Sequence, residues 1–300
     1  VVIAGFVQLL IQLLPLHKRG IYLRPTWEVH SEPFKKIIYL MGPMIFGLTV
    51  TQINTLADHF VALWLSGSQE KGQFFSCLGT QIRYPLWEGA VSHLFYSQRL
   101  YQFPLGVLGI SLATAIFPVM SSDAAKKDYT ALSATISRAL RCIFFIALPA
   151  TVGLIMVAKP LVAVIFQRGQ FTSEDTLTTA WTLCFYALGL CGYFAQQITI
   201  RSFYSIQDSK MPALTALVAV FINITLNLTL VWPMGTAGLA SSTALCSYGQ
   251  VIILLMVLRR RLGPLVMDKL PTALLKTTIA TALMWAAGAA MLATVQHWPE

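Results

Sequence analysis

The 300-residue chain is too apolar and too sparsely charged for a soluble protein of its length. Hydrophobic residues make up 56% of the sequence and charged residues only 11%, whereas about 25% of the residues of a soluble domain are charged. The net charge of +9 could indicate a nucleic-acid partner. However, most basic residues fall where a membrane protein has its cytoplasmic loops, so we expect no nucleic acid among the partners.

Long apolar runs predict about eight membrane-spanning helices, because each run after the first is long enough to cross the hydrocarbon layer and none shows the alternation of strands. In chain order, the runs cover residues 1–16, 37–65, 90–120, 139–166, 176–200, 211–232, 235–258 and 271–296. The first run leads directly into His17, Lys18 and Arg19, the reverse of the charge order in a signal peptide. We therefore interpret it as the end of a longer helix. The sequence predicts an all-α polytopic membrane protein, with residues 1–300 as one membrane region of a larger protein.

The distribution of the basic residues predicts the orientation of these helices. If the helices alternate in direction, the loops and flanks after the first, third, fifth and seventh runs hold most of the chain's 21 Lys and Arg. These are Lys18, Arg19, Arg24, Lys35, Lys36, Lys126, Lys127, Arg138, Arg141, Arg201, Lys210, Arg259, Arg260, Arg261, Lys269 and Lys276. The positive-inside rule puts these loops in the cytoplasm, where they would contact anionic membrane lipids.

On the opposite side, the longest connection is residues 66–89, which we expect to be a loop. Within it, Ile82, Tyr84, Leu86 and Trp87 could anchor the loop at the membrane interface.

The second apolar run carries a small, polar face. Gly47, Thr51, Asn54 and Asp58 are spaced four, three and four residues apart, which aligns them on one side of a helix. Such a face either holds neighbouring helices together by hydrogen bonds or lines a cavity. The sequence leaves both interpretations open.

The third run contains an arginine within the span, on a face shared by Ser92, Tyr96, Arg99, Phe103 and Gly106. No acidic residue lies within one helical turn of Arg99. Its guanidinium keeps its charge, and its planar fork matches the oxygens of a phosphate. We therefore predict that Arg99 faces a substrate. The alternatives are that Arg99 reaches toward the outer interface or forms a structural ion pair with Asp58.

The residues needed for enzyme chemistry are missing from the apolar runs. No pair of carboxylates and no glycine-rich phosphate loop is present, so we expect neither a catalytic site nor ATP hydrolysis. The five cysteines form no CxxC motif; four lie in apolar helices and Cys77 lies alone in its loop. We therefore predict no disulfide, no metal site and no cofactor. Pro43, Pro104 and Pro149 lie within spans and are expected to kink them, either as hinges or as packing features.

Several motifs resemble those of one family, the MurJ/MviN lipid II flippases. They are Gln52-Ile53-Asn54, residues 98–109 (QRLYQFPLGVLG) with Ala115-Ile116-Phe117-Pro118, residues 166–172 (FQRGQFT), Phe203-Tyr204-Ser205 with residues 208–212 (DSKMP), and residues 235–240 (GTAGLA). Their order and spacing agree with the family over nearly the whole chain.

The resemblance implies a transporter of the MOP superfamily, with fourteen helices in two lobes. This chain would supply part of helix six through helix thirteen, without the N-terminal lobe and the last helix. The implied task is to move lipid II, an undecaprenyl-pyrophosphate-linked peptidoglycan precursor, across the bacterial cytoplasmic membrane by alternating access for cell-wall synthesis. Coupling to an ion gradient or the membrane potential is a further expectation. Arg99 occupies the position of an arginine that contributes to the family's cationic cavity.

We predict that the substrate is bound by polar side chains of the second and third runs, namely Arg99, Asn54, Asp58, Tyr96, Gln98, Gln102 and Ser92. The chain departs from the family at three places. Many members carry an acid at the position of Gln98, and some carry one at the position of Gln102. Residues 66–87 look like an insertion. These departures change the local charge balance around Arg99.

Three other functions remain open at this point. The chain could belong to a related exporter of polysaccharide lipids or drugs in the same superfamily. It could be a membrane scaffold of a cell-wall complex that transports nothing. It could also belong to a membrane transferase, which would need a metal-binding pair of acids outside this sequence.

Overall fold

The computed structural model describes residues 2–18, 20, 31–77, 80–263 and 270–296. The chain divides into two compact units, Val1–Tyr39 and Leu40–Glu300. The first unit contains α1 (Val2–Lys18) and the beginning of α2 (Glu32–Trp64). Three of the residues predicted to be cytoplasmic lie outside the described residues, namely Arg19 and Arg24 between these two helices and Lys269 after the seventh run.

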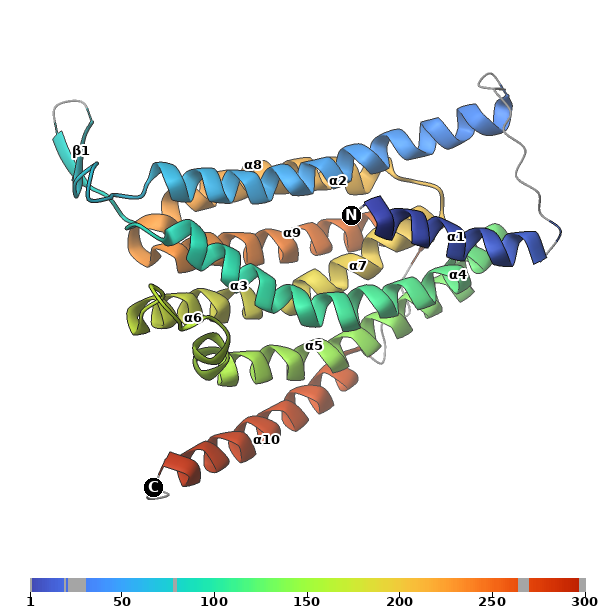
Figure 1. Ribbon diagram of the computed structural model, residues 1–300. Coiled ribbons are helices and arrows are strands. Elements are labelled where there is room, and N and C mark those ends of the chain that lie inside the picture. The colour runs from blue at the N-terminus through green and yellow to red at the C-terminus, as the bar shows by residue number, and fades with distance from the viewer. Residues whose placement is uncertain (1, 19, 21–30, 78–79, 264–269, 297–300) are drawn as a thin grey trace. The chain divides into compact units, whose positions relative to one another are not determined.

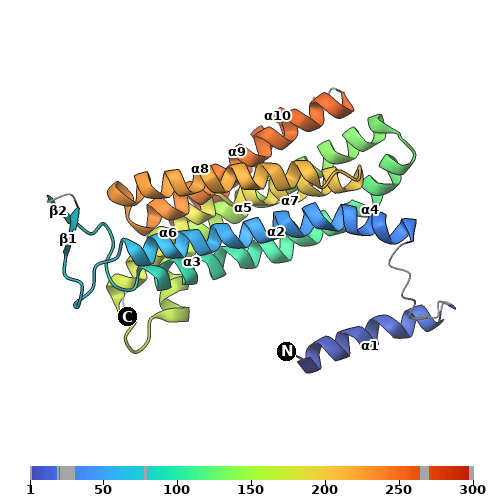
Figure 2. The same ribbon diagram turned by 90° about the horizontal axis from the view of Figure 1, so that it is seen from above.

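The second unit contains the rest of α2 and all the later elements (Figures 1 and 2). These are β1 (Phe74–Cys77), β2 (Thr80–Arg83), α3 (Ala90–Pro104), the π-helix η1 (Leu105–Ile110), α4 (Ser111–Ala125), α5 (Tyr129–Phe166), α6 (Ser173–Leu188), α7 (Leu190–Ser205), α8 (Lys210–Met234), α9 (Thr236–Leu262) and α10 (Leu270–Gln296). Helix α7 packs against α4, α5 and α9 and thus lies inside the bundle, while α10 packs on α5.

The long helices agree with the predicted spans. Within the described part of the chain, six helical segments are long and apolar enough to cross a membrane, and α6 with α7 makes a seventh if this bent pair is one span. The predicted run at residues 1–16 is helical, as α1, but its 17 residues are shorter than the about 20 residues that a span needs.

Many large apolar side chains cover the outside of the second unit. Val164 is 77% exposed, Phe103 72% and Phe60 67%. A water-soluble protein would bury side chains of this kind, but hydrocarbon solvates them without cost. The outward-facing apolar surface therefore indicates that lipid surrounds these helices.

Polar side-chain contacts connect the helices at both ends of the second unit. Near the start of α3, His93 Nε2 lies 3.0 Å from the carboxylate of Asp175, in the first turn of α6. At the opposite ends of the helices, Arg261 of α9 lies 2.5 Å from Asp208, between α7 and α8. The two pairs hold the starts of α3 and α6 at one end and the end of α9 at the other, as expected if successive spans alternate in direction.

Two of the spans are interrupted. After Pro104, the chain continues as the π-helical turn η1 before α4 begins. Such irregular turns are common where a proline interrupts the regular backbone hydrogen bonds of a helix. Helices α6 and α7 meet at Gly189 with a bend of 42°. The first interruption coincides with the kink predicted at Pro104. No proline marks the bend at Gly189 in the sequence.

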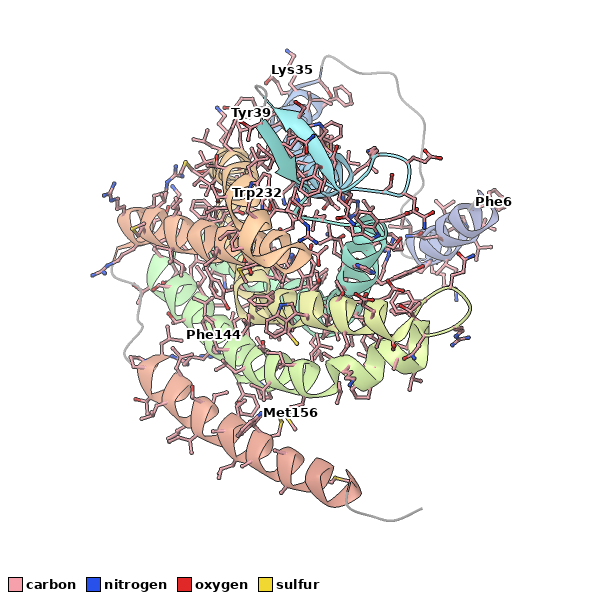
Figure 3. All side chains as sticks on the ribbon, turned by 90° about the vertical axis from the view of Figure 1, so that its left-hand side faces the viewer. Phe6, Lys35, Tyr39, Phe144, Met156 and Trp232 are labelled. Carbon is pink, nitrogen blue, oxygen red and sulfur yellow. The ribbon has the colours of Figure 1, made fainter. Side chains whose placement is uncertain are left out.

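Close helix packing depends on glycine at particular positions. A Cβ at Gly238 in α9 would lie 2.2 Å from the carbonyl oxygen of Leu230 in α8, so only glycine permits this approach. Met156 of α5 also lies against Gly288 of α10, where a Cβ would be 2.2 Å from its terminal carbon (Figure 3), but the end of this flexible side chain can move aside. Small residues at such crossings are typical of membrane helices.

The connection at residues 66–89 contains two short paired strands, where the sequence predicted only a loop. Strands β1 and β2 pair antiparallel, with Phe75 opposite Ile82, and Phe75 packs on Tyr84 with 4.9 Å between ring centroids. Of the residues predicted to anchor the loop at the interface, Leu86 is instead buried, while Trp87 is exposed. Leu86 is buried because its backbone binds Leu65 and Gly67 at the end of α2.

Candidate functional site

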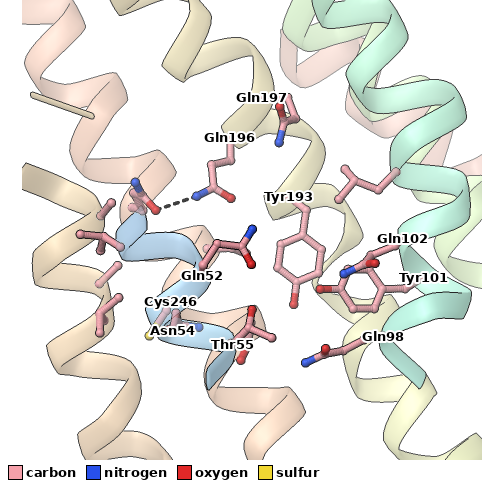
Figure 4. Close-up of a pocket in the computed structure, with 18 of the residues that line it drawn as sticks. Gln52, Asn54, Thr55, Gln98, Tyr101, Gln102, Tyr193, Gln196, Gln197 and Cys246 are labelled. Atoms are coloured by element: carbon pink, nitrogen blue, oxygen red, sulfur yellow. Dashed lines mark hydrogen bonds between the residues drawn. The ribbon is translucent and has the colours of Figure 1, made fainter. Parts of the chain in front are cut away.

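A polar cavity lies inside the second unit, between α2, α3, α7, α8 and α9 (Figure 4). Its volume is about 450 Å³, within the range of about 300–1,000 Å³ that is usual for ligand pockets. Helix α7, which follows the bend at Gly189, lines the cavity with Tyr193, Gln196 and Gln197. The walls come from helices far apart in the sequence, so the cavity exists only in the folded bundle.

Carboxamide side chains dominate the lining. Beside Asn54, they are Gln52, Gln98, Gln102, Gln196, Gln197 and Gln250. The described residues that line the cavity include no carboxylate. Because polar side chains are costly at membrane depth, such a concentration marks a site that contacts water or a polar ligand.

Arg99 lies on the cavity wall and its side chain is exposed. Its guanidinium carbon is 4.8 Å from the centroid of the Phe95 ring, which lines the same cavity. No ion pair joins Arg99 to Asp58 or to another acid in the described part of the chain. The described residues thus show no structural ion pair between Arg99 and Asp58.

Gln98 and Gln102 both line the cavity but differ in how they are held. Gln98 is buried, and its Nε2 donates a hydrogen bond of 3.0 Å to the hydroxyl of Tyr186. Gln102 is exposed. Tyr101, between them, stacks on Tyr186 on one side and on Tyr193 on the other, with centroid distances of 4.9 and 5.1 Å.

Asp58 lies outside the cavity lining, although Asn54 on the same helix belongs to it. Asp58 is 1% exposed. It accepts hydrogen bonds from Asn227 Nδ2 at 2.6 Å and from Thr243 Oγ1 at 3.1 Å. The polar face of α2 thus joins this helix to α8 and α9, as in the helix-packing interpretation, and it lines the cavity only at Asn54. The side chain of Thr51 lies outside those described.

Neither Ser92 nor Tyr96 lines this cavity. Tyr96 stacks on Phe166 of α5 with 4.4 Å between ring centroids, and its edge meets Phe171. Ser92 is exposed, one turn before Tyr96 on α3. The residues predicted to share one face of α3 therefore have different neighbours. Tyr96 packs against α5 and the loop before α6, whereas Arg99 lies on the wall of the cavity that α2 and α7 also line.

The structure adds residues that the sequence analysis did not single out. Tyr193, Gln196, Gln197 and Gln250 come from α7 and α9, and His59 from α2. The sequence could have indicated these residues, because a glutamine at membrane depth is as unfavourable as the polar residues singled out in the second and third runs.

Within the described residues, no group of three or more His, Cys, Asp or Glu side chains is placed to hold a metal ion. What the cavity offers is hydrogen bonds, aromatic faces and one guanidinium. This chemistry is suited to binding a polar ligand with an anionic group.

Comparison with known proteins identifies the family. Residues 1–299 match the family model described as lipid II flippase MurJ. A "Probable lipid II flippase MurJ" of Vibrio cholerae serotype O1 is 34% identical over 254 residues, which cover 85% of this chain and 44% of that protein. A protein of the same description from Haemophilus influenzae is 30% identical over 250 residues, covering 81% of this chain and 44% of the relative. The chain spans about half the length of the curated relatives it matches.

Solved structures show the same fold. "Lipid II flippase MurJ, inward closed conformation" aligns with a TM-score of 0.67 and 23% identity, over 97% of this chain and 54% of that one. An outward-facing multidrug transporter of the MATE family, within the MOP superfamily, aligns with a TM-score of 0.59 and 16% identity, over 88% and 56% of the two chains. The match to the family model over residues 1–299 and the 34% identity to the Vibrio cholerae relative establish that the chain, a multi-pass α-helical protein of the bacterial cytoplasmic membrane, belongs to the MurJ family of lipid II flippases.

Proposed function

We propose that the protein containing this chain moves lipid II across the cytoplasmic membrane by alternating access, for peptidoglycan synthesis. The observation that carries the proposal is the polar cavity at membrane depth, with Arg99 on its wall, in a chain that belongs to the MurJ family. Transport of this kind requires binding and a change of conformation but no covalent chemistry. Lipid II and the surrounding lipids would be the partners.

The chain would form most of the C-terminal part of the transporter, from part of helix six through helix thirteen. Its match to only 44% of the length of its relatives supports this proposal. A second, N-terminal lobe would complete the cavity. The irregular turns at η1 and at Gly189 provide places where the helices beside the cavity could bend as access alternates.

Arg99 would bind the pyrophosphate of the substrate. Its guanidinium lies on the cavity wall without an acidic partner among the described residues, and a guanidinium can donate two parallel hydrogen bonds to phosphate oxygens. Among the other predicted residues, Asn54, Gln98 and Gln102 share the cavity with Arg99. We propose these three as substrate contacts and assign no such contact to Ser92 or Tyr96.

Asp58 suggests where coupling to an ion gradient or the membrane potential could act. It is a carboxylate buried between three helices, and the described residues place no cation beside it. A charge at this depth requires a proton or a small cation to balance it. We propose that Asp58 exchanges such an ion. The variant Asp58→Asn keeps the shape of the side chain and should make transport insensitive to collapse of the proton and sodium gradients. Unchanged sensitivity would contradict this role.

The function itself is tested with the full-length protein in proteoliposomes. Fluorescently labelled lipid II should cross from one leaflet to the other when the protein is present, and Arg99→Ala should abolish the transfer. A drug exporter of the same superfamily would instead accumulate a cationic dye in the same vesicles and leave lipid II in place. That result would reject the lipid II proposal in favour of the multidrug alternative, whose fold the chain shares.

A further inference from the structure

The three arginines at the end of α9 have different surroundings. Arg261 lies 2.5 Å from Asp208, and its guanidinium carbon is 5.9 Å from the centroid of the Phe203 ring. Arg259 and Arg260 are exposed, and the ion pairs within the described part of the chain include neither of them. Arg261 thus holds α9 in the bundle, while the other two direct their charge outward, at the end of α9 that the basic residues assign to the cytoplasm.

A hollow of about 450 Å³ lies at the two exposed arginines. The described residues that line it are Met256, Arg259, Arg260 and Gly263, and none of these is an acid. A planar guanidinium can donate two parallel hydrogen bonds to the oxygens of a phosphate. Two guanidiniums beside one hollow are therefore suited to a phosphate group at the surface of the membrane.

An apolar groove between α8 and α9 leads toward this hollow. Its volume is about 90 Å³, and mostly aliphatic side chains line it. The lining extends from Leu226 and Leu245, nearer the turn between the two helices, to Thr215 and Ile253, nearer the arginines. Gly249 also lines the groove, and a Cβ at this position would meet nothing within 4 Å. The missing side chain at Gly249 thus leaves the groove open to an apolar ligand.

The groove and the hollow share one face of α9. Gly249, Ile253, Met256 and Arg260 are spaced four, three and four residues apart, which aligns them along a helix. Ile253 belongs to the groove, and Met256, 53% exposed, belongs to the hollow. An apolar stripe that ends in cations matches the two parts of a phospholipid, because its acyl chains lie in the hydrocarbon and its phosphate lies at the surface.

We propose that this face of α9 binds an anionic phospholipid of the cytoplasmic leaflet. One acyl chain lies in the groove between α8 and α9, and the phosphate contacts Arg259 and Arg260. Basic pockets on the cytoplasmic side of membrane helices bind headgroups of this kind. Both helices also line the polar cavity, so the bound lipid stabilises two of its walls. The proposal is independent of the substrate that the cavity takes.

The test titrates two lipids onto the delipidated full-length protein in detergent, with bound lipid counted by native mass spectrometry. The probes are dioleoyl phosphatidylglycerol, which is anionic, and dioleoyl phosphatidylcholine, which has the same chains and no net charge. Replacing both Arg259 and Arg260 by Gln should weaken binding of phosphatidylglycerol by about 25-fold, because each basic residue near the membrane surface contributes a factor of about five. The Kd of phosphatidylcholine should not change.

A second variant tests the groove without changing any charge. The side chain of Gly249→Leu should fill the groove and weaken the binding of both dioleoyl lipids. Dihexanoyl phosphatidylglycerol has the same headgroup but chains too short to follow the groove, so its weaker binding should not respond to Gly249→Leu. The matched control replaces Lys126 and Lys127 by Gln. This change removes two exposed cations from the connection between α4 and α5, which is predicted to face the same side, and should change neither Kd.

Three results would overturn the proposal. The first is equal binding of phosphatidylglycerol and phosphatidylcholine by the unmodified protein. The second is an equal loss of phosphatidylglycerol binding in the arginine pair and in the lysine pair, which would show a general effect of surface charge. The third is an unchanged Kd for both dioleoyl lipids in Gly249→Leu, and this variant decides the question by itself if the glutamine pair does not insert.

Discussion

Replacement of Arg99 by alanine should remove transport while leaving the protein nearly as stable as before. The side chain is exposed, and its described contact is the Phe95 ring, 4.8 Å from the guanidinium carbon. A cation–π contact at an exposed site contributes about 0.5–1 kcal/mol. Since the described residues pair Arg99 with no carboxylate, truncation leaves no acid without a partner, and the free energy of unfolding should fall by about 1 kcal/mol at most.

Asp58→Ala provides the contrast. Asp58 accepts hydrogen bonds from Asn227 and Thr243 while almost fully buried. Its truncation takes the acceptor from the buried Asn227 amide, which should cost about 1–3 kcal/mol, while Thr243 Oγ1 can still donate to the carbonyl of Leu239 at 3.1 Å. The two residues act independently in the structure, and the stability effects of Arg99→Ala and Asp58→Ala should therefore add.

Two measurements check this reasoning. Thermal unfolding of the purified full-length variants gives the stabilities, and rescue of cells depleted of their own lipid II flippase gives the activity. Arg99→Lys should rescue only in part, because an ammonium keeps the charge and loses the bidentate fork. The double variant should stay inactive and be as unstable as the two single variants combined. A double variant that inserts normally and regains activity would refute the substrate role of Arg99, since it would show that the two charges compensate each other.

Three further predictions concern topology, completeness and packing. In a background without native cysteines, a cysteine at the exposed Ser76 should react with an impermeant thiol reagent added outside, and one at Ser122 should not; the reverse pattern would overturn the orientation and hence the side from which Arg99 is reached. The chain expressed by itself should insert but fail to rescue flippase-depleted cells, because one lobe does not enclose a two-lobed cavity; rescue would show that an N-terminal lobe is dispensable. Gly238→Ala places a Cβ 2.2 Å from the Leu230 carbonyl oxygen and should lower the unfolding free energy by about 1–3 kcal/mol. Gly249→Ala, with nothing within 4 Å, is the matched control and should leave stability unchanged or slightly higher; equal effects of the two changes would contradict the close α8–α9 contact.

Most of the fold was predictable because lipid imposes a simple rule on the chain. A backbone in hydrocarbon must satisfy its hydrogen bonds internally, so long apolar runs become helices. The runs at 139–166 and 235–258 correspond to α5 and α9. The hairpin at Phe74–Arg83 was missed because strands of four residues outside the membrane carry no such constraint, and a short polar and aromatic stretch is equally compatible with a loop.

The candidate site was predicted in part. The cost of polar groups at membrane depth singled out Asn54, Gln98, Arg99 and Gln102, and the structure brings these four to one cavity. The same argument grouped Asp58 with them, but this carboxylate is bound to other helices. Sequence gives the face of a helix on which a residue lies, while the neighbour that this face meets depends on the packing of the bundle.

The amino-acid sequence by itself determined the approximate bounds of most spans and the family to which the chain belongs, since composition, periodicity and local motifs are properties of short segments. Only the tertiary structure decided which polar residues share a cavity. Tyr193 and Gln250 come from α7 and α9 and share the cavity lining with Gln52 of α2, and α7 packs against α9. No single segment of the sequence determines that these residues share a cavity, because the cavity forms only when helices distant in sequence pack together. This packing decides which polar side chains face water, a ligand or one another.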